Sequence, residues 1–253
     1  MKNIEKKIRA YISTLYHYIS SNFYQSRIKS AIQIPIIINN YNRVTTLIRL
    51  IESLETRGYS NIYIIDNNSD YPPLLEYYET CKYKVFHLKK NLGFKALWKS
   101  KLNKELCKDY FIYTDSDVVL HEDCPCDIID VLWKKLKAKK FTRKIGLSIC
   151  INDIPDSFAH KQKVLNMESA YYSQYDKEEN LYRAPVDTTF ALYKPKMSLS
   201  RSRFVEVYRI GYPYQLKHLP WYVDSSNLNE EETYYISSCK HATTWSSKAK
   251  KDN

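Results

Sequence analysis

Two carboxylates separated by a single residue, in Asp115-Ser116-Asp117, are the residues whose type and spacing most clearly predict chemistry. They come directly after residues 110–113, a short apolar run that predicts a buried strand. Carboxylates at positions i and i+2 beyond a strand can converge on one hard divalent cation, because such cations prefer oxygen ligands. A cation held there neutralises phosphate oxygens and stabilises a departing diphosphate as a Lewis acid. We therefore predict a metal site, with a strand-ending turn as the alternative interpretation.

Three earlier apolar runs also end in polar side chains. They are residues 34–38, 62–65 and 84–88, each short enough to be a strand that is buried on both faces. The groups that follow them are Asn39, Asn40, Tyr41, Asn42 and Arg43, then Asp66, Asn67 and Asn68, then Asn91 and Gly93. Ligands bind at the carboxyl ends of the strands in an open parallel sheet. Four polar strand ends therefore predict one shared binding site that includes the metal.

Helices are predicted between these strands. Helical periodicity runs through residues 42–57, 72–81 and 94–106, and Gly58 lies where a helix-ending glycine is typical. Short buried strands that alternate with helices favour an α/β fold, with a mostly parallel, Rossmann-like sheet and flanking helices in a single domain. Beyond residue 125 we predict a helix at 127–139, strands at 145–151 and 186–193, and a last helix at 230–238.

The first 32 residues form a different kind of segment. Apolar residues recur there at helical spacing with basic residues among them: Ile4, Ile8, Tyr11, Ile12, Leu15, Tyr18 and Ile19, with Lys2, Lys6, Lys7 and Arg9. This pattern predicts an amino-terminal basic amphipathic helix. Such a helix either packs against the domain or lies on an anionic membrane surface, and the sequence leaves both interpretations open.

The composition limits how this protein can bind an anion. Its 253 residues carry a formal net charge of +11, which suits a phosphorylated substrate, an acidic membrane surface or a nucleic acid. Only 4 residues are glycine and no glycine-rich phosphate motif is present, so side chains and a metal would have to neutralise a bound phosphate. The 6 cysteines include no C-x-x-C pair, and no signal peptide or membrane-spanning run is recognisable. We expect reduced thiols and a cytoplasmic protein.

The runs IPIIINNYNR, IYIIDNNSD, KNLGFKALW and YFIYTDSD together resemble the nucleotide-binding half of family-2-like glycosyltransferases with the GT-A fold. The resemblance implies metal-dependent transfer of a sugar from a nucleotide-diphosphate donor to a glycan or lipid-linked acceptor, usually with inversion. It implies Mn²⁺ or Mg²⁺ as cofactor and no nucleic-acid partner. The donor site that it implies contains Asn40, Tyr41 and Arg43 beside the nucleotide, Asp66 at the base, Asn91 and Gly93 at the sugar, and Asp115 and Asp117 at the metal and diphosphate.

The carboxyl half resembles the family less, and the family's glycine-rich acceptor segment is absent. The resemblance implies an acid that acts as general base near the start of a late helix, and a late histidine that reaches the metal. The candidate bases are Asp187 and Glu231, followed by Asp224, and the candidate histidines are His218 and His241. These expectations divide the chain into residues 1–32, the amphipathic helix, residues 33–124, the nucleotide-sugar-binding half, and residues 125–253, the acceptor-binding half with a basic tail.

Two other functions compete with this interpretation. A haloacid-dehalogenase-like phosphatase also carries an Asp-x-Asp motif after a buried strand, and it would use Asp115 as nucleophile. Its motif usually lies near the amino terminus, whereas three predicted strands precede the motif here. A basic nucleic-acid-binding protein would explain the charge and the 24 tyrosines but not the four polar strand ends. We therefore expect a cytoplasmic glycosyltransferase, and peripheral contact with the inner face of an anionic membrane is one of the two interpretations of its amino-terminal helix.

Overall fold

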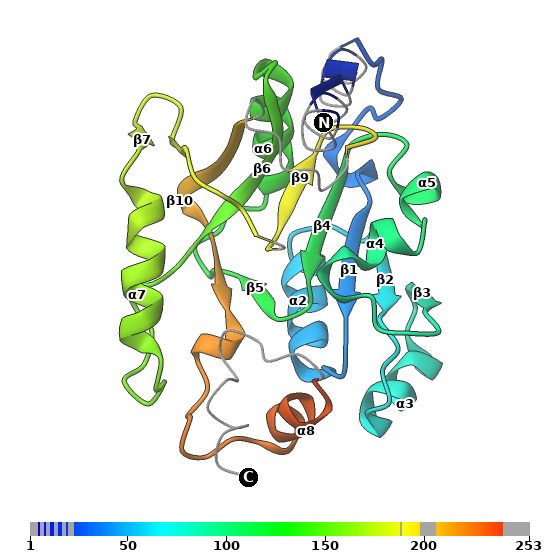
Figure 1. Cartoon of the computed structure of the whole chain (residues 1–253), viewed down its shortest axis with the longest axis vertical. Coiled ribbons are helices and arrows are strands. Elements are labelled where there is room, and N and C mark those ends of the chain that lie inside the picture. The colour runs from blue at the N-terminus through cyan, green and yellow to red at the C-terminus, as the bar shows by residue number, and fades with distance from the viewer. Residues whose placement is uncertain are drawn as a thin grey trace.

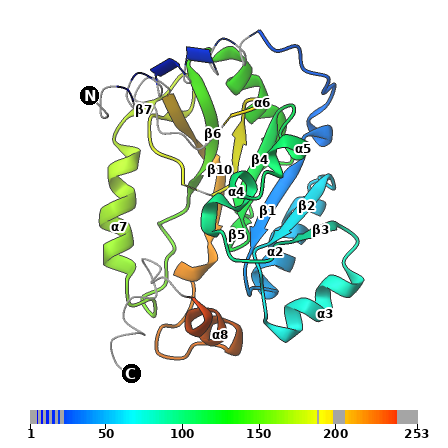
Figure 2. The same cartoon turned by 45° about the vertical axis from the view of Figure 1, so that its right-hand side comes forward.

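The structure is a computed structural model that describes residues 5, 8, 11, 12, 15, 16, 19, 23–187, 189–197 and 206–239. One sheet runs through the middle of the molecule, and helices lie on both of its faces (Figures 1 and 2). The layered α/β architecture predicted from the alternation of strands and helices is confirmed.

The first half of the sheet contains four parallel strands, β1 (Ile36–Asn40), β2 (Ile62–Asp66), β3 (Lys84–His87) and β4 (Phe111–Asp115). Their order across the sheet is β3-β2-β1-β4. The strand β1 is buried along its whole length because its isoleucines meet a hydrophobic core on each face. This explains why it appears in the sequence as a continuous apolar run rather than an alternating one.

The second half of the sheet is built around two longer strands, β6 (Thr142–Ile149) and β10 (Glu206–His218), which are parallel to each other. The strand β9 (Ala191–Tyr193) lies between β4 and β6 and is antiparallel to both. Three short strands complete a 10-stranded sheet within the described residues: β5 (Val118–Leu120), β7 (Tyr175–Asp176) and β8 (Leu181–Tyr182). The strand β9 therefore joins the two halves in one hydrogen-bonded ladder.

Two hydrophobic cores lie on opposite faces of the sheet. The larger core packs α2 (Thr45–Glu55) and α6 (Ile128–Ala138) against the strands. The smaller core contains the buried residues of α4 (Ala96–Lys99) together with Phe111 and Tyr193, whose rings stack at a centroid distance of 5.0 Å. The remaining helices are α3 (Pro72–Thr80), α5 (Asn103–Leu106), α7 (Lys161–Ser169) and α8 (Glu230–Ser238), with 3-10 turns η1 (Ala31–Gln33), η2 (Gly93–Lys95), η3 (Ala170–Tyr172) and η4 (Leu219–Trp221).

Several predicted elements differ from the structure. The single helix predicted at residues 94–106 is broken into η2, α4 and α5, with Lys101 in the left-handed region at φ 69°. In an unbroken helix Leu97 and Leu102 would point roughly 140° apart at about 100° per residue, whereas the break lets both pack in the smaller core. The helix α7 and the strand β10 were not predicted.

The strand predicted at residues 186–193 is shorter than expected and contains only β9. Val186 is buried and packs over Gly146, where a side chain on Gly146 would come within 2.4 Å of it. The chain before β9 therefore packs onto the face of β6 instead of extending the strand.

Seven residues of the amino-terminal segment are described, and all seven are helical and exposed: Glu5, Ile8, Tyr11, Ile12, Leu15, Tyr16 and Ile19. The other members of the predicted amphipathic helix lie outside the described residues, namely Ile4, Tyr18, Lys2, Lys6, Lys7 and Arg9. In the part of the chain that the structure describes, no helix combines the length and the apolar character needed to cross a bilayer.

Candidate functional site

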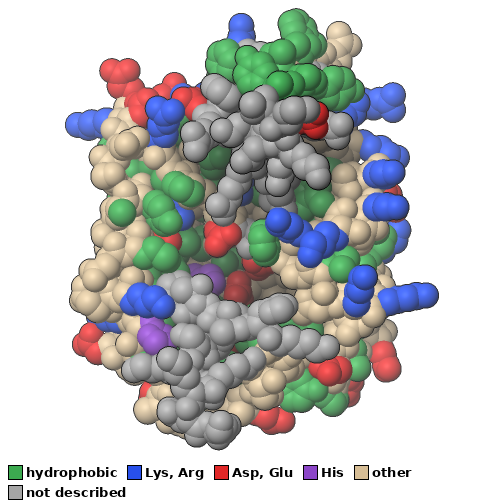
Figure 3. Space-filling view, viewed as in Figure 1, with side chains coloured by type: hydrophobic (Ala, Val, Ile, Leu, Met, Phe, Trp, Pro, Cys, Tyr) green, Lys and Arg blue, Asp and Glu red, His purple; other side chains and the backbone are tan. Residues whose placement is uncertain are grey.

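The carboxyl ends of β1, β2 and β4 lie side by side, because β1 is parallel to both of its neighbours. In the register of the sheet, Asn39 pairs with Asp115, and Asn40 pairs with Asp66. The polar strand ends predicted to converge are thus brought to one edge. Figure 3 shows acidic and histidine side chains inside a hollow on the face viewed in Figure 1.

The Asp-x-Asp segment is held in place by its middle residue. Ser116 is buried, and its hydroxyl donates to the side-chain oxygen of Asn40 at 2.6 Å while its backbone N–H donates to the carbonyl of Asn39 at 3.2 Å. Asn39 also donates from its side-chain amide to Asp115 at 3.1 Å. The two carboxylates flank this fixed point, since Asp115 ends β4 and Asp117 begins the turn into β5.

His218 lies next to the second carboxylate of this motif. Its Nε2 is 3.6 Å from a carboxylate oxygen of Asp117, and the following residue, Leu219, donates its N–H to the Asp117 carbonyl at 2.8 Å. Burial lowers the pKa of His218, and the attraction of Asp117 only partly opposes this effect. The ring is therefore neutral at pH 7, and its buried Nδ1 has no hydrogen-bond partner among the described residues.

Asp115, Asp117 and His218 are chemically suited to bind a divalent metal ion, and among them the structure brings His218 and Asp117 into contact. Two carboxylates and one neutral imidazole are ordinary ligands of such ions, and the uncharged ring offers a lone pair without first losing a proton. The other candidate histidine, His241, lies outside the described residues.

Asp66 is the last residue of β2. Its carboxylate is buried and accepts from the backbone N–H of Ser69 at 3.3 Å, and His87 Nδ1 lies 3.4 Å away. The ring of Tyr78 packs edge-on against His87 at 5.5 Å, and burial together with Asp66 raises the pKa of the Tyr78 hydroxyl. A carboxylate bordered by two aromatic rings suits a flat heterocycle that carries N–H donors.

The predicted sugar-side loop is held to the end of β2. Asn91 accepts from the N–H of Gly93 at 2.8 Å, and Gly93 adopts a left-handed conformation at φ 66°. Asn67 holds this loop from both sides, since its side chain accepts from Leu92 N–H at 2.7 Å and donates to the Gly93 carbonyl at 3.2 Å. Asn67 was recognised in the sequence only as part of a polar strand end, so its holding role is new.

Asn40 is engaged in structural hydrogen bonds. It is fully buried, and its side-chain amide donates to the Arg43 carbonyl and to the Tyr78 hydroxyl, both at 2.9 Å. Its side-chain oxygen accepts from Ser116. Asn40 therefore shapes the site by connecting β1 to β4 and α3, rather than by presenting its side chain to a nucleotide.

Tyr41 and Arg43 both turn toward α8. The hydroxyl of Tyr41 donates to the Ser238 carbonyl at 3.1 Å. Arg43 is buried, forms a two-bond ion pair with Glu232, and lies over the ring of Tyr235 at 3.9 Å. Both partners of this ion pair are nearly inaccessible, so the guanidinium is unavailable to a phosphate group in this arrangement.

Two of the three candidate bases are in positions that do not suit the role. The Glu231 carboxylate is buried and accepts from the N–H groups of Val44 and Thr45, at 2.9 and 2.8 Å, at the start of α2. It therefore caps a helix and satisfies two backbone donors. Asp224 is exposed and accepts from the N–H and the hydroxyl of Ser226, at 2.9 and 2.6 Å, in a local turn.

Asp187 is the candidate base that lies near the metal-binding group. It is exposed, and it is close enough to His218 to raise the pKa of that ring against the larger effect of burial. Its backbone carbonyl accepts from the ammonium of Lys144 at 3.1 Å, and Lys144 also donates to the Tyr193 hydroxyl at 2.9 Å. Burial, followed by Arg143, lowers the pKa of Lys144 to about 7.

Lys144 was not predicted from the sequence as a residue of the site. In the sequence it is one of many basic residues between residues 134 and 144, and nothing distinguishes it from a solvated lysine. Its buried position follows from the place of β6 inside the sheet, where it pairs with β9 on one side and β10 on the other.

Comparison with known proteins supports the glycosyltransferase interpretation. Residues 36–138 match the family model of glycosyl transferase family 2. No curated protein matches the sequence. The family match favours a glycosyltransferase over the phosphatase and over the nucleic-acid-binding protein.

Three solved structures are distantly similar to the chain. The mannosyltransferase PcManGT from Pyrobaculum calidifontis, in complex with GDP-Man and Mn²⁺, has 11% identity and a TM-score of 0.46, and the match covers 99% of this chain and 75% of that chain. GalNAc-T7 with UDP, GalNAc and Mn²⁺ has 15% identity and a TM-score of 0.46, and the match covers 85% of this chain and 51% of that chain. S. aureus TarS 1-349 has 12% identity and a TM-score of 0.44, and the match covers 74% of this chain and 60% of that chain. The chain thus spans about half of the GalNAc-T7 chain.

Proposed function

We propose that the chain is a glycosyltransferase, because residues 36–138 match the family model of glycosyl transferase family 2. It would transfer a sugar from a nucleotide-diphosphate donor to a glycan or lipid-linked acceptor, with metal dependence and inversion. The observation that carries the proposal is that parallel β1, β2 and β4 bring Asp66 and Asp115 to one edge of the sheet, where His218 lies 3.6 Å from Asp117. Metal-binding side chains and a carboxylate beside aromatic rings at the same edge would serve the two ends of a nucleoside diphosphate.

Asp115, Asp117 and His218 would hold the cation. An imidazole in the ligand set favours Mn²⁺ over Mg²⁺, because Mg²⁺ is bound almost entirely through oxygen. When bound, the cation would neutralise the diphosphate as it leaves. Asn39 and Ser116 keep the carboxylates at the end of β4, so no glycine-rich loop is required to surround the phosphates.

Asp66 would accept an N–H of the base, and the loop of Asn91 and Gly93 would border the sugar. The aromatic neighbours of Asp66 are placed to pack against a flat ring, and Asn67 fixes the loop next to it. This arrangement separates the parts of the donor. The base contacts β2 and α3, while the diphosphate contacts the end of β4.

Asp187 is proposed as the general base. Its carboxylate would take the proton of the acceptor hydroxyl while that oxygen forms a bond to the anomeric carbon and the diphosphate leaves from the opposite side. Lys144 would position Asp187 by holding its backbone carbonyl. An exposed carboxylate beside the metal-binding group can meet an acceptor that arrives from solvent, which the buried Glu231 cannot do.

We further propose that the enzyme acts in the cytoplasm and contacts the inner face of an anionic membrane peripherally. The net charge of +11 and the exposed apolar residues of the amino-terminal segment support this contact. A lipid-linked acceptor would then lie in the same surface that the enzyme contacts.

A thermal-shift panel of nucleoside diphosphates, with and without Mn²⁺, tests the proposal. A ligand that binds only the folded state at about 100 times its Kd stabilises it by about 2.7 kcal/mol, which such a panel detects. Stabilisation should require Mn²⁺ in the wild type and should vanish in Asp117→Ala. Asp156→Ala, which removes an exposed carboxylate paired with Lys161, is the matched control and should respond like wild type. Metal-dependent stabilisation that survives in an Asp115→Ala/Asp117→Ala variant would refute the assigned site.

A further inference from the structure

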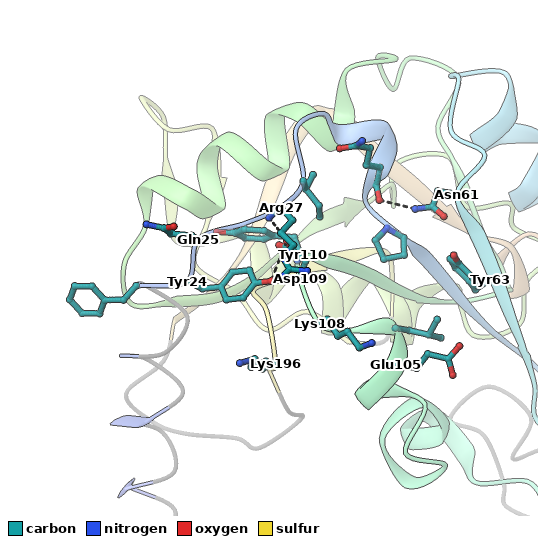
Figure 4. Close-up of a pocket in the computed structure, with 15 residues that line it drawn as sticks. Tyr24, Gln25, Arg27, Asn61, Tyr63, Glu105, Lys108, Asp109, Tyr110 and Lys196 are labelled. Atoms are coloured by element: carbon teal, nitrogen blue, oxygen red, sulfur yellow. Dashed lines mark hydrogen bonds between the residues drawn. The ribbon is translucent and has the colours of Figure 1, made fainter.

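A pocket of about 950 Å³ lies at the amino ends of β1, β2 and β4, at the opposite end of these strands from Asp115. The segment before η1 forms one wall, and the residues that precede the three strands form the other. The side chains that decide its chemistry are Tyr24, Arg27, Tyr63, Lys108, Tyr110 and Lys196, and Figure 4 shows how they lie. Aromatic rings and cations thus share one cavity at an end of the molecule that the donor site does not use.

The charges in this pocket favour an anionic ligand. Of its two acids, Glu105 pairs with Lys84 at 3.4 Å, whereas Asp109 accepts from neutral groups, including Ser26 and two backbone N–H groups, each at 2.8 Å, and keeps its charge. No described residue forms an ion pair with Arg27, Lys108 or Lys196. These three cations outnumber the one acid that has no cationic partner among the described residues, so the pocket carries net positive charge.

An exposed apolar stripe leads directly to this pocket. Its members recur at helical spacing and are exposed by 46 to 83%: Ile8, Tyr11, Ile12, Leu15, Ile19 and Phe23. The N–H of Phe23, which lines the pocket, donates to the Ile19 carbonyl at 3.2 Å, so the stripe is bonded to the wall of the pocket. Figure 3 shows hydrophobic side chains gathered at this end of the molecule with basic side chains beside them. Monomeric soluble proteins rarely expose an apolar patch of this kind.

The charge pattern identifies the surface that fits this stripe. The first 22 residues contain Lys2, Lys6, Lys7 and Arg9 but only one acid, Glu5. Apolar side chains inserted at the level of the lipid headgroups, with cations above them, are the features by which a helix binds an anionic bilayer. A protein partner would need an apolar groove lined by acids, whereas a bilayer of anionic phospholipid supplies both properties over any area.

We propose that this end of the molecule rests on an anionic bilayer, with the stripe inserted among the headgroups and the pocket holding the phosphate of one lipid. The inference deepens the proposed membrane contact by assigning the residues that make it. The strand β4 rises about 3.3 Å per residue, so the five steps from Tyr110 to Asp115 correspond to about 17 Å. The metal-binding group would stand at about that distance from the headgroup, within reach of a sugar carried on a lipid diphosphate.

Cosedimentation of the full chain with vesicles tests the assignment. The vesicles are phosphatidylcholine alone, or phosphatidylcholine with 30 mol% phosphatidylglycerol, a composition chosen for about one anionic lipid in three. We expect the triple variant Arg27→Gln/Lys108→Gln/Lys196→Gln to bind the anionic vesicles about 10²-fold more weakly, since each cation near such a surface contributes about fivefold. The matched control Lys89→Gln/Lys90→Gln/Lys177→Gln removes the same charge from exposed positions elsewhere and should bind within about threefold of wild type. An equal loss in both triple variants would show that only net charge matters, and would overturn the pocket assignment.

Two further measurements separate the lipid from other occupants. Ile12→Asp/Leu15→Asp should lower binding to both kinds of vesicle at least tenfold while the unfolding temperature stays within a few degrees. If sedimentation velocity instead shows a wild-type dimer that this variant dissolves, and vesicle binding is unchanged, the stripe is covered by a second copy and the inference fails. It also fails if inorganic phosphate stabilises the chain through the pocket cations while anionic vesicles do not bind. None of these readouts involves sugar transfer, so they remain informative if the proposed enzymatic function is wrong.

Discussion

Replacing Glu231 by Gln should lower stability and leave catalysis intact, because the carboxylate caps α2 rather than facing an acceptor. It accepts two backbone N–H bonds, at 2.9 and 2.8 Å, and it is 6% exposed. A hydrogen bond to a charged group contributes about 1.5–3 kcal/mol and a neutral one about 1 kcal/mol. Gln can keep both bonds in neutral form, so the change should cost about 2–3 kcal/mol once the interaction with the helix dipole is included. At this chain length that loss lowers the unfolding temperature by roughly 4–12 °C.

Urea denaturation followed by circular dichroism measures the loss of stability, and the steady-state transfer rate per folded molecule measures catalysis. We expect a kcat within threefold of wild type. Glu230→Gln is the matched control, because Glu230 is exposed and precedes Glu231 in the same helical turn. Its stability should stay within about 0.5 kcal/mol of wild type. A kcat at least 10²-fold lower in Glu231→Gln, with unchanged stability, would show that Glu231 is the base and that the capping argument is wrong.

Three other predictions concern the site itself. Asp187→Asn should lower kcat by about 10²-fold or more while the affinity for the donor stays unchanged, and steady-state kinetics at varied donor concentration measure both. Turnover near the wild-type rate would show that another residue is the general base. His218→Ala should weaken Mn²⁺ binding by about 10-fold or more in a metal titration with nucleoside diphosphate present, and an unchanged Mn²⁺ affinity would remove His218 from the ligand set. Lys144 has a folded pKa of about 7 against an ordinary 10.5, so between pH 7 and 10 the unfolded chain holds a proton that the folded chain has released. The unfolding free energy of wild type should therefore rise with pH relative to Lys144→Met, by about 1 kcal/mol per pH unit, and parallel curves in urea titrations would contradict the burial of Lys144.

The parallel half of the fold could be predicted from the sequence because its signals are local. Runs such as residues 34–38 are apolar without interruption, and turn-forming residues bound them on each side. The strand β10 gave no such signal, since Pro213 lies in its middle and proline removes a ladder hydrogen bond. The structure accommodates Pro213 at an irregularity, because the register with β6 shifts between Ile210 and Gln215. Only the folded sheet shows that Pro213 lies where the strand needs no ladder hydrogen bond from its backbone nitrogen.

In the candidate site, too, the residues with local sequence signals could be predicted and those placed by long-range packing could not. Asp66 and Asp115 end strands of the parallel half, and Asp117 follows β4 by two residues, so the topology alone brings them to one edge of the sheet and their positions could be predicted. The burial of Arg43 could not be predicted, since its partner Glu232 is 189 residues away and belongs to a helix whose docking leaves no mark on the sequence pattern. A charged residue after β1 looks the same in a sequence whether it faces a phosphate or another helix. Tertiary packing decides whether such a residue faces a phosphate or another helix, and the pattern of a single sequence carries no information on that packing.

The position of β9 has a consequence for how the enzyme can move. Because β9 is bonded to β4 on one side and to β6 on the other, a rotation of the half of the sheet that contains β1 and β4 against the half that contains β6 and β10 would break backbone hydrogen bonds in the middle of the sheet. The hydrogen bonds of β9 therefore oppose hinge closure of two lobes, a motion that many ligand-binding proteins use. Motion that admits a substrate or releases a product would instead occur in the segments that connect the strands.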